Sequence, residues 1–176
     1  MQIGLFQIIF NERRCLLKKV EKYVVGRRLT DEEYQFIFDR VPRLCIDIVV
    51  VKQNGILFFK REIEPFKGKW TLPGGAMRMG ENFDTAHQRI LNAEFGPKVK
   101  CIKKRIIGVC NHWPDGPNRH SVSILFQTVI SGRITGSDQG HEIKIISDFT
   151  EKSIQPFHQK WFLDSTFLDS NIEFTC

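Results

Sequence analysis

The stretch that decides the fold runs from Trp70 to Gly96 and reads Trp-Thr-Leu-Pro-Gly-Gly-Ala-Met-Arg-Met-Gly-Glu, then Asn-Phe-Asp-Thr-Ala-His-Gln-Arg-Ile-Leu-Asn-Ala-Glu-Phe-Gly. A proline and two glycines lie near its start, so the backbone is predicted to turn tightly there and to approach a ligand closely. A helix is predicted from about Phe83 to Phe95, because Asn82 is a favoured N-cap residue. Glycine followed by proline then ends this helix.

Charged side chains recur in this stretch at fixed spacings. Five residues separate Gly75 from Glu81, and seven separate Glu81 from Arg89. Positions 90, 93 and 94 of the predicted helix share a face, since residues three and four apart are neighbours. Carboxylates on that face would gather Mg²⁺, which takes oxygen ligands and pairs with substrate phosphates. Only Glu94 is a carboxylate, because positions 90 and 93 hold isoleucine and alanine.

The surviving carboxylate limits the metal chemistry that the helix can support. Glu94, a backbone carbonyl from the glycine turn and phosphate oxygens together suffice for one metal ion, whereas a multi-metal cluster is harder to build. Arg89 lies beside the same face, where it is predicted to pair with Glu81. Arginine stays protonated, so it serves better as a clamp than as a base.

The spacing resembles the Nudix box, in which a glycine and a glutamate precede the pattern Arg-Glu-U-x-Glu-Glu-x-Gly, where U is aliphatic. Six positions match this box: Gly75, Glu81, Arg89, Leu91, Glu94 and Gly96. The resemblance implies an α+β chain folded as a Nudix-like α/β/α sandwich around a central mixed sheet, and it implies a hydrolase.

The two missing glutamates sharpen the resemblance. A box with Ile90 and Ala93 in their place is similar to that of the GDP-mannose mannosyl hydrolase branch of the family. The similarity runs from about Leu29 to Ile146 and includes several further segments: Leu29–Tyr34, Cys45–Val50, Phe59–Arg61, Gly108–His112 and Asp138–Glu142. Two residues depart from that branch, since Ala76 replaces an arginine and Gly140 replaces a glutamine.

The resemblance implies roles for the matched residues. Its catalytic residues would be His141, Arg61 and Arg89. Asp47, Arg61 and His112 would contact the substrate, and Gly74, Glu94 and Gln139 would hold the metal. Glu81 and Gly75 would support the site. The cofactor implied is Mg²⁺, with Mn²⁺ as an alternative.

The implied reaction breaks the bond between sugar and diphosphate. In that branch, water attacks the anomeric carbon with inversion, and GDP leaves with Mg²⁺. Two-metal sites clamp both the attacking and the leaving oxygen of a phosphoryl displacement, whereas attack on a sugar carbon needs only a base for the water and neutralisation of the leaving group. Glycosidases usually protonate the leaving oxygen with a carboxylic acid, but a diphosphate already leaves well. A histidine such as His141 titrates near neutrality and suits the base.

Several of these residues also have a plainer interpretation. His141 lies in a polar loop and is then a solvated surface residue, while His112 ends an apolar strand and is then satisfied by backbone. His87 and His158 are expected on the surface. Asp47 interrupts an apolar strand, so it either faces solvent or points inward to a sugar hydroxyl.

Three functions remain open from the sequence. The first is hydrolysis of a nucleotide sugar, GDP-mannose or GDP-glucose, at the anomeric carbon. The second is an ordinary Nudix diphosphatase that cleaves a nucleoside diphosphate derivative between phosphates, for which Glu81 or Glu142 would supply the missing metal ligands. The third is a nucleotide-sugar-binding module without turnover.

Length and composition bound the organisation of the chain. Its 176 residues suffice for one well-buried domain, expected at residues 29–176 after an N-terminal extension, residues 1–28, that forms a strand pair. Five scattered cysteines without a C-x-x-C pair indicate reduced thiols in a cytoplasmic protein, with Cys45 and Cys110 in the core. No signal peptide or membrane-spanning run is expected. The resembling enzymes form homodimers, so a homodimer is expected here.

The charge and the remaining elements complete the prediction. Basic residues are dispersed and give a net charge of +6, which fits a polyanionic small substrate better than a nucleic acid. A capping box at Thr30 and Glu33 predicts a helix to about Phe38. Strands are predicted at residues 4–10, 14–20, 44–51, 56–61, 100–110, 121–130 and 144–146, with a helix at 157–168. Asn54-Gly55 predicts a hairpin between the strands that flank it.

Overall fold

A computed structural model describes residues 29–52, 55–113, 120–136 and 142–164. Grouped by contacts, Leu29–Met77 and the described residues from Glu81 onward form one compact unit, and Arg78–Gly80 do not belong to it. The strand pair predicted at residues 4–10 and 14–20 lies outside the described residues, as do Gln139 and His141.

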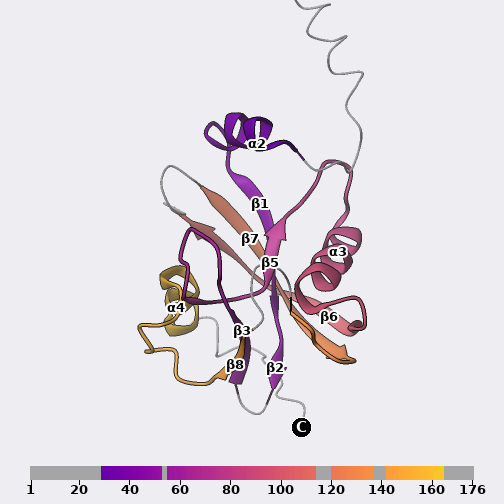
Figure 1. Cartoon of the computed structure of the whole chain (residues 1–176), viewed down its shortest axis with the longest axis vertical. Coiled ribbons are helices and arrows are strands. Elements are labelled where there is room, and N and C mark those ends of the chain that lie inside the picture. The colour runs from indigo at the N-terminus through magenta and orange to yellow at the C-terminus, as the bar shows by residue number, and fades with distance from the viewer. Residues whose placement is uncertain (1–28, 53–54, 114–119, 137–141, 165–176) are drawn as a thin grey trace, which may run out of the picture. The chain divides into compact units, whose positions relative to one another are not determined.

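Three helices and eight strands make up the described fold (Figure 1). The helices are α2 (Asp31–Phe38), α3 (Phe83–Phe95) and α4 (Pro156–Leu163). The strands are β1 (Arg43–Val49), β2 (Val51–Lys52), β3 (Gly55–Lys60), β4 (Trp70–Thr71), β5 (Gly74–Ala76), β6 (Lys100–His112), β7 (Ser121–Ser131) and β8 (Ile143–Ile146).

The strands form two hydrogen-bonded sheets of four strands each. One sheet has the order β5-β1-β7-β6, and its β1–β7 pair is parallel while its other pairs are antiparallel. In the other sheet, β3 pairs with β2, β4 and β8, all antiparallel. The predicted fold class, α+β with a mixed sheet and helices, is therefore confirmed, with the strands divided between two sheets.

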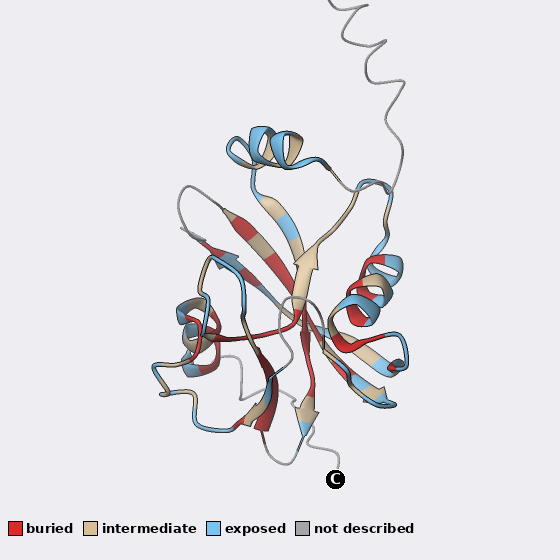
Figure 2. Cartoon of the chain, viewed as in Figure 1, coloured by how far each residue is buried: buried red, intermediate tan, exposed pale blue. Residues whose placement is uncertain are grey.

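Two hydrophobic clusters lie on opposite faces of these strands, and each is closed by one helix. Strand β1 alternates between them, since Ile46 and Ile48 belong to the cluster under α3 while Val49 belongs to the cluster under α4. Helix α3 contributes Ala86, Ile90, Leu91 and Phe95, and helix α4 contributes Trp161 and Phe162. Figure 2 shows this buried material along the central strands and on the inward sides of both helices. A period of two along β1 thus produces a core on both faces.

Helix α3 begins and ends where the sequence predicts. The Asn82 side chain accepts a hydrogen bond from the Thr85 amide at 2.9 Å, and the Thr85 side chain accepts one from the Asn82 amide at 3.1 Å. Gly96 ends the helix with a φ of 98°, and a Cβ there would lie 2.0 Å from the Thr135 hydroxyl. Only glycine therefore fits this C-cap.

Two predicted elements differ in the structure. Gly74 and Gly75 lie in the extended strand β5, which pairs with β1, and not in a tight turn. Helix α4 starts at Pro156, a residue favoured at the first helical position, and ends at Leu163. The predicted continuation to residue 168 is wrong at Asp164, which is extended and caps the helix, and residues 165–168 lie outside the described part of the chain.

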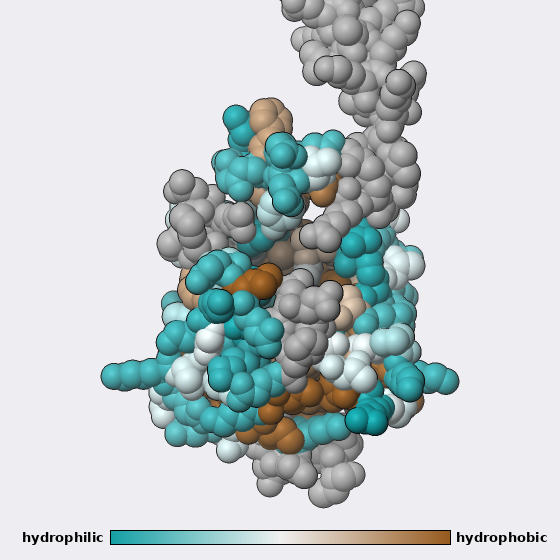
Figure 3. All heavy atoms as spheres, viewed as in Figure 1, coloured by the Kyte–Doolittle hydropathy of each residue, from teal (hydrophilic) through white to brown (hydrophobic). Residues whose placement is uncertain are grey.

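The surface seen in Figure 3 is mostly hydrophilic, with hydrophobic side chains gathered in a few patches. No helix in the described part of the chain is long and apolar enough to cross a membrane.

Candidate functional site

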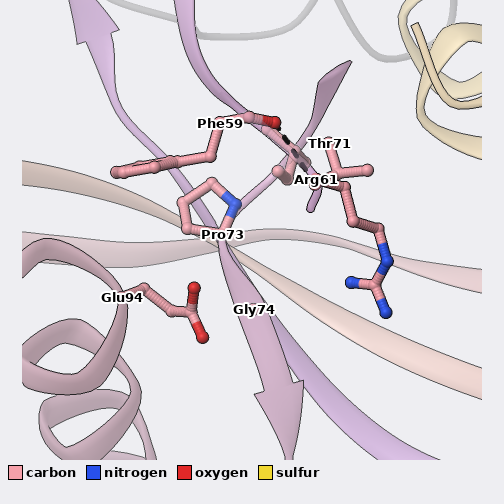
Figure 4. A pocket seen from close by; sticks show the side chains of 7 residues that line it. Phe59, Arg61, Thr71, Pro73, Gly74 and Glu94 are labelled. Atoms are coloured by element: carbon pink, nitrogen blue, oxygen red, sulfur yellow. Dashed lines mark hydrogen bonds between the residues drawn. The ribbon is translucent and has the colours of Figure 1, made fainter. Parts of the chain in front are cut away.

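A pocket opens where β4 leads into β5, beside helix α3. In Figure 4, Glu94 reaches from α3 toward Gly74, and Arg61 lies on the other side of that glycine. The pocket is lined by Phe59, Arg61, Thr71, Leu72, Pro73, Gly74 and Glu94. The structure therefore brings together three predicted site residues that are up to 33 positions apart in the chain, Arg61, Gly74 and Glu94.

The three box positions on α3 face different surroundings. Ile90 is 2% exposed and packs in the core, 3.4 Å from the place where a Cβ on Gly75 would lie. Ala93 is exposed to solvent, and half-buried Glu94 lines the pocket. The three positions were predicted to share one face of the helix, but in the structure one is buried, one is exposed and one lines the pocket. Of the three, Glu94 is the one placed to bind a ligand in the pocket.

The close approach of Asp47 requires a glycine at position 74. The two residues pair across β5 and β1, and a Cβ on residue 74 would lie 1.9 Å from Asp47 Oδ1 and 2.8 Å from the Ile46 carbonyl oxygen. Asp47 is 8% exposed, so the solvent-facing interpretation is wrong. Its contact with a sugar hydroxyl stays a prediction, since Asp47 is not among the residues that line the pocket. Burial and then the Asp47 charge raise the pKa of the neighbouring Cys110 thiol to about 12.

Arg61 is anchored by the loop that connects β3 to β4. Its Nε donates to the Pro65 carbonyl at 2.6 Å, and its backbone amide donates to the Lys69 carbonyl at 2.9 Å. These carbonyl acceptors orient the guanidinium. The geometry therefore places a positive group beside the pocket.

Arg89 forms the clamp that the sequence predicts. It binds both carboxylate oxygens of Glu81, at 2.5 Å through Nε and at 2.8 Å through a terminal nitrogen, and donates to the Ala76 carbonyl at 2.9 Å. A bidentate pair of this kind gives directional as well as electrostatic stabilisation. Arg89 thus ties the middle of α3 to Glu81, just before the helix, and to the end of β5, and it is not among the residues that line the pocket.

Two histidines expected on the surface are buried. His158 is 6% exposed, and its Nδ1 accepts a hydrogen bond from the Leu72 amide at 3.1 Å. His87 is 0% exposed and hydrogen-bonds the Thr128 hydroxyl through Nε2 at 2.9 Å. The surface expectation is wrong for both residues, because each is buried with a polar partner distant in the chain, Thr128 in β7 for His87 and the Leu72 amide for His158.

Burial also sets the protonation of these histidines. It lowers the pKa of His87 to about 4, with the nearby Lys104 charge acting in the same direction. It lowers the pKa of His158 well below the usual value, assisted by His112 and Arg61. Both rings are consequently neutral near pH 7.

His112 lies in an aromatic cluster at the end of β6. It is 4% exposed, and its ring centroid lies 4.3 Å from that of Trp161, 5.2 Å from Phe157 and 6.0 Å from His158. It does not appear among the residues that line the pocket. The substrate-contact role predicted for His112 therefore stays a prediction, and its observed surroundings are those of packed rings.

The pocket suits a single metal ion better than a cluster. Among the described residues, no group of three or more histidine, cysteine, aspartate or glutamate side chains is arranged to hold a metal. Glu94 does face the backbone at Gly74, and hard divalent cations accept a carboxylate, a backbone carbonyl and phosphate oxygens as ligands. The described donors thus suit one divalent ion, for which Glu94 and a backbone carbonyl could serve as two of the ligands.

Five residues of this region were not among the predicted site residues. Phe59, Thr71, Leu72 and Pro73 line the pocket, and His158 anchors Leu72. Thr71 and Leu72 directly precede the proline and glycines, so their position beside the motif was a usable signal. His158 lies 86 residues from Leu72, and no local pattern indicates that contact.

Comparisons with known proteins agree with this architecture. ADP-ribose pyrophosphatase of Methanocaldococcus jannaschii is 36% identical over 104 residues, which cover 57% of this chain and 59% of that protein, less than two thirds of its length. The low-salt glycan biosynthesis protein Agl8 of Haloferax volcanii is 25% identical over 140 residues, 76% of this chain and 88% of that protein.

Solved structures show the same fold. The MutT NUDIX hydrolase from Burkholderia pseudomallei superposes with a TM-score of 0.58 at 22% identity, covering 66% of this chain and 92% of that one. The MutT protein from Methanosarcina mazei Go1 gives a TM-score of 0.58 at 18% identity, covering 70% and 92%. The NUDIX domain matches residues 41–164, more than half of the sequence, and the chain therefore belongs to the Nudix family.

Proposed function

We propose that this protein is a Nudix hydrolase that cleaves a nucleotide sugar, GDP-mannose or GDP-glucose, at the anomeric carbon and releases GDP and the sugar. The observation that carries this proposal is the composition of the pocket. Glu94 is the one carboxylate among its lining residues, and Arg61 lies across Gly74 from it. One anionic ligand and one fixed cation suit a leaving diphosphate better than they suit a two-metal phosphoryl displacement.

The residues would divide the chemistry as follows. Glu94 and a backbone carbonyl at Gly74 would hold Mg²⁺ or Mn²⁺, which when bound neutralises charge on the departing diphosphate. Arg61 would bind the same diphosphate, and Asp47 would accept a hydrogen bond from a sugar hydroxyl. A base would take the proton of the water that attacks the anomeric carbon while the bond from carbon to diphosphate oxygen breaks. His141, outside the described residues, is the proposed base, and Gln139 the proposed additional metal ligand.

A second candidate is a diphosphatase that cleaves between the phosphates. The similarity to an ADP-ribose pyrophosphatase favours it. It needs further carboxylates at the metal, and the sequence offers Glu81 and Glu142. Both carboxylates already bind cations, since Glu81 is paired with Arg89 and Glu142 lies 2.8 Å from Lys60 Nζ. The similarity to a glycan biosynthesis protein over most of its length fits the first candidate better.

Isotope labelling separates these candidates. The protein is incubated with GDP-mannose, GDP-glucose or ADP-ribose and Mg²⁺ in ¹⁸O-water, and the products are analysed by mass spectrometry. Label in the sugar together with GDP supports the proposal. Label in a phosphate together with a nucleoside monophosphate supports the second candidate. Nucleotide-sugar binding without any product indicates a binding module and contradicts both.

A pair of variants identifies the carboxylate that matters. Glu94→Gln removes the pocket carboxylate while keeping its size, and turnover is expected to fall by about 100-fold or more, because metal stabilisation of a transition state is worth several kcal/mol. Glu142→Gln removes an exposed carboxylate paired with Lys60. Turnover within about threefold of the unsubstituted protein is expected for it, whereas a diphosphatase that uses Glu142 would lose activity.

A further inference from the structure

Within the described part of the chain, the edge of strand β4 that pairs with the segment around Ile154 has no further backbone hydrogen bond at Leu72, which lines the pocket. The Trp70 amide donates to the Ser153 carbonyl at 2.9 Å, and the Gln155 amide donates to the Trp70 carbonyl at 2.9 Å. Trp70 and Ile154 thus form a parallel bridge. In a parallel ladder, the next amide on this edge, that of Leu72, would donate to the carbonyl of Gln155.

That carbonyl is already engaged by a helix. Gln155 is the N-cap of α4, and its carbonyl accepts the Gln159 amide at 2.9 Å. The Leu72 amide donates instead to Nδ1 of His158, at 3.1 Å. The imidazole therefore replaces the missing backbone acceptor and extends the ladder by one hydrogen bond.

The His158 ring is fixed from several sides. Its backbone amide donates to the Gln155 side chain at 3.1 Å. Its ring centroid lies 5.0 Å from Trp161, 6.0 Å from His112 and 6.5 Å from Phe58. An acceptor role for Nδ1 requires the neutral ring with its proton on Nε2.

The anchored residue leads directly into the pocket wall. Leu72, Pro73 and Gly74 line the pocket in sequence, and the Pro73 carbonyl accepts the Ile48 amide at 2.8 Å. One side of this wall is therefore held by β1 and the other by His158. A displacement of the wall would move the Gly74 backbone relative to Glu94.

We propose that His158 is a positioning residue for hydrolysis, which holds the Leu72–Gly74 wall at the distance from Glu94 and Arg61 that ligand binding requires. The inference rests on the proposed function, because it assigns the pocket to the reaction. It goes beyond that proposal, since it places a residue of α4 in control of the site without contact to the substrate.

Three substitutions isolate the hydrogen bond from packing. His158→Asn places an amide oxygen near the position of Nδ1 and keeps an acceptor. His158→Gln places its polar atoms near Nε2, and His158→Leu fills the space with neither. We expect kcat in the Asn variant within about threefold of the unsubstituted protein, and a drop of at least about tenfold in the Gln and Leu variants.

Readouts besides turnover complete the test. Hydrogen exchange of the Leu72 amide is expected to accelerate at least about tenfold in the Gln and Leu variants but not in the Asn variant, and Mn²⁺ affinity measured by electron paramagnetic resonance is expected to fall in parallel. Imidazole ¹⁵N shifts of the unsubstituted protein are expected to show a proton on Nε2. If His158→Leu does not fold, the Asn and Gln pair decides the question.

Different results would contradict the positioning role of His158 and the proposed hydrolase function. Equal activity and equal Leu72 exchange in all variants would overturn the positioning role, as would an Asn variant as impaired as the Leu variant. Absence of turnover by the unsubstituted protein on every substrate would overturn the proposed function. In that case, Leu72 exchange and Mn²⁺ affinity still show whether His158 positions the wall.

Discussion

Asp47 and Gly74 pair across two strands so closely that the carboxylate of one fills the side-chain space of the other. A Cβ on residue 74 would lie 1.9 Å from Asp47 Oδ1, well inside any real contact. Gly74 directly precedes the first glycine of the box, and Asp47 lies in strand β1. Position 74 requires a glycine because the buried Asp47 carboxylate occupies the space that a side chain would need. The same contact brings two residues of the predicted site together.

The first prediction concerns the two neighbouring glycines. Gly74→Ala is expected to lower the free energy of unfolding by roughly 3 kcal/mol, because both the Asp47 carboxylate and the Ile46 backbone must move. Gly75→Ala is the matched control, since its Cβ would meet only Ile90 at 3.4 Å, and a change below about 1 kcal/mol is expected. Urea unfolding followed by circular dichroism measures both. Equal losses for the two variants would contradict the interpretation.

The second prediction concerns the clamp between Arg89 and Glu81. Its side chains are 26% and 12% exposed, so Arg89→Met removes two charged hydrogen bonds from a largely buried carboxylate, and a loss of about 2 kcal/mol in unfolding free energy is expected. Lys144→Met breaks a more exposed pair with Glu151, for which less than about 1 kcal/mol is expected. In a double-mutant cycle with Glu81→Gln, the coupling free energy between the two substitutions is expected to account for most of the loss caused by Arg89→Met. A coupling free energy near zero would contradict the clamp.

The third prediction restores carboxylates to α3. Ile90→Glu would bury a carboxylate in the core, so a loss of roughly 3 kcal/mol or more in unfolding free energy is expected. Ala93→Glu lies on the exposed side of the helix, and a change within about 0.5 kcal/mol is expected. Thermal and urea unfolding distinguish the two. A stable Ile90→Glu variant would show that the core can open to admit a metal ligand.

The fourth prediction concerns pH and His87. Its pKa is about 4 in the folded state and about 6.5 when unfolded, so below pH 6.5 the unfolded chain binds a proton that the native chain excludes. The native state is therefore destabilised as pH falls from 6.5 toward 4, by about 2 kcal/mol at pH 5 from this residue alone. Stability at higher pH is unaffected by this group.

A neutral variant tests the pH prediction. His87→Gln retains a polar group for Thr128 and cannot titrate, so its unfolding free energy is expected to fall less between pH 8 and pH 5, by the amount assigned to His87. Buried His158 contributes a loss of the same sign and remains in both proteins. Identical pH slopes for the variant and the unsubstituted protein would contradict the prediction.

Much of the framework could be predicted from local sequence. The α3 boundaries follow from an Asn82 cap and a Gly96 stop, the α2 start follows from the Thr30 and Glu33 capping box, and both are confirmed. The pairing of Arg89 with Glu81 follows from residue spacing near one helix. The six box positions identify the family, because their spacing reports a local motif that folds the same way in many chains.

The tertiary structure decided what local patterns do not encode. Gly74 became strand and not turn because β1 offers backbone partners and Asp47 occupies the adjacent space. His158 accepts the Leu72 amide where the Gln155 carbonyl, the acceptor expected in a parallel ladder, is already bonded to Gln159 in helix α4. Local sequence determines propensities, caps and motif spacing. The partner of a buried polar group depends on elements distant in the chain, so only the assembled fold determines it.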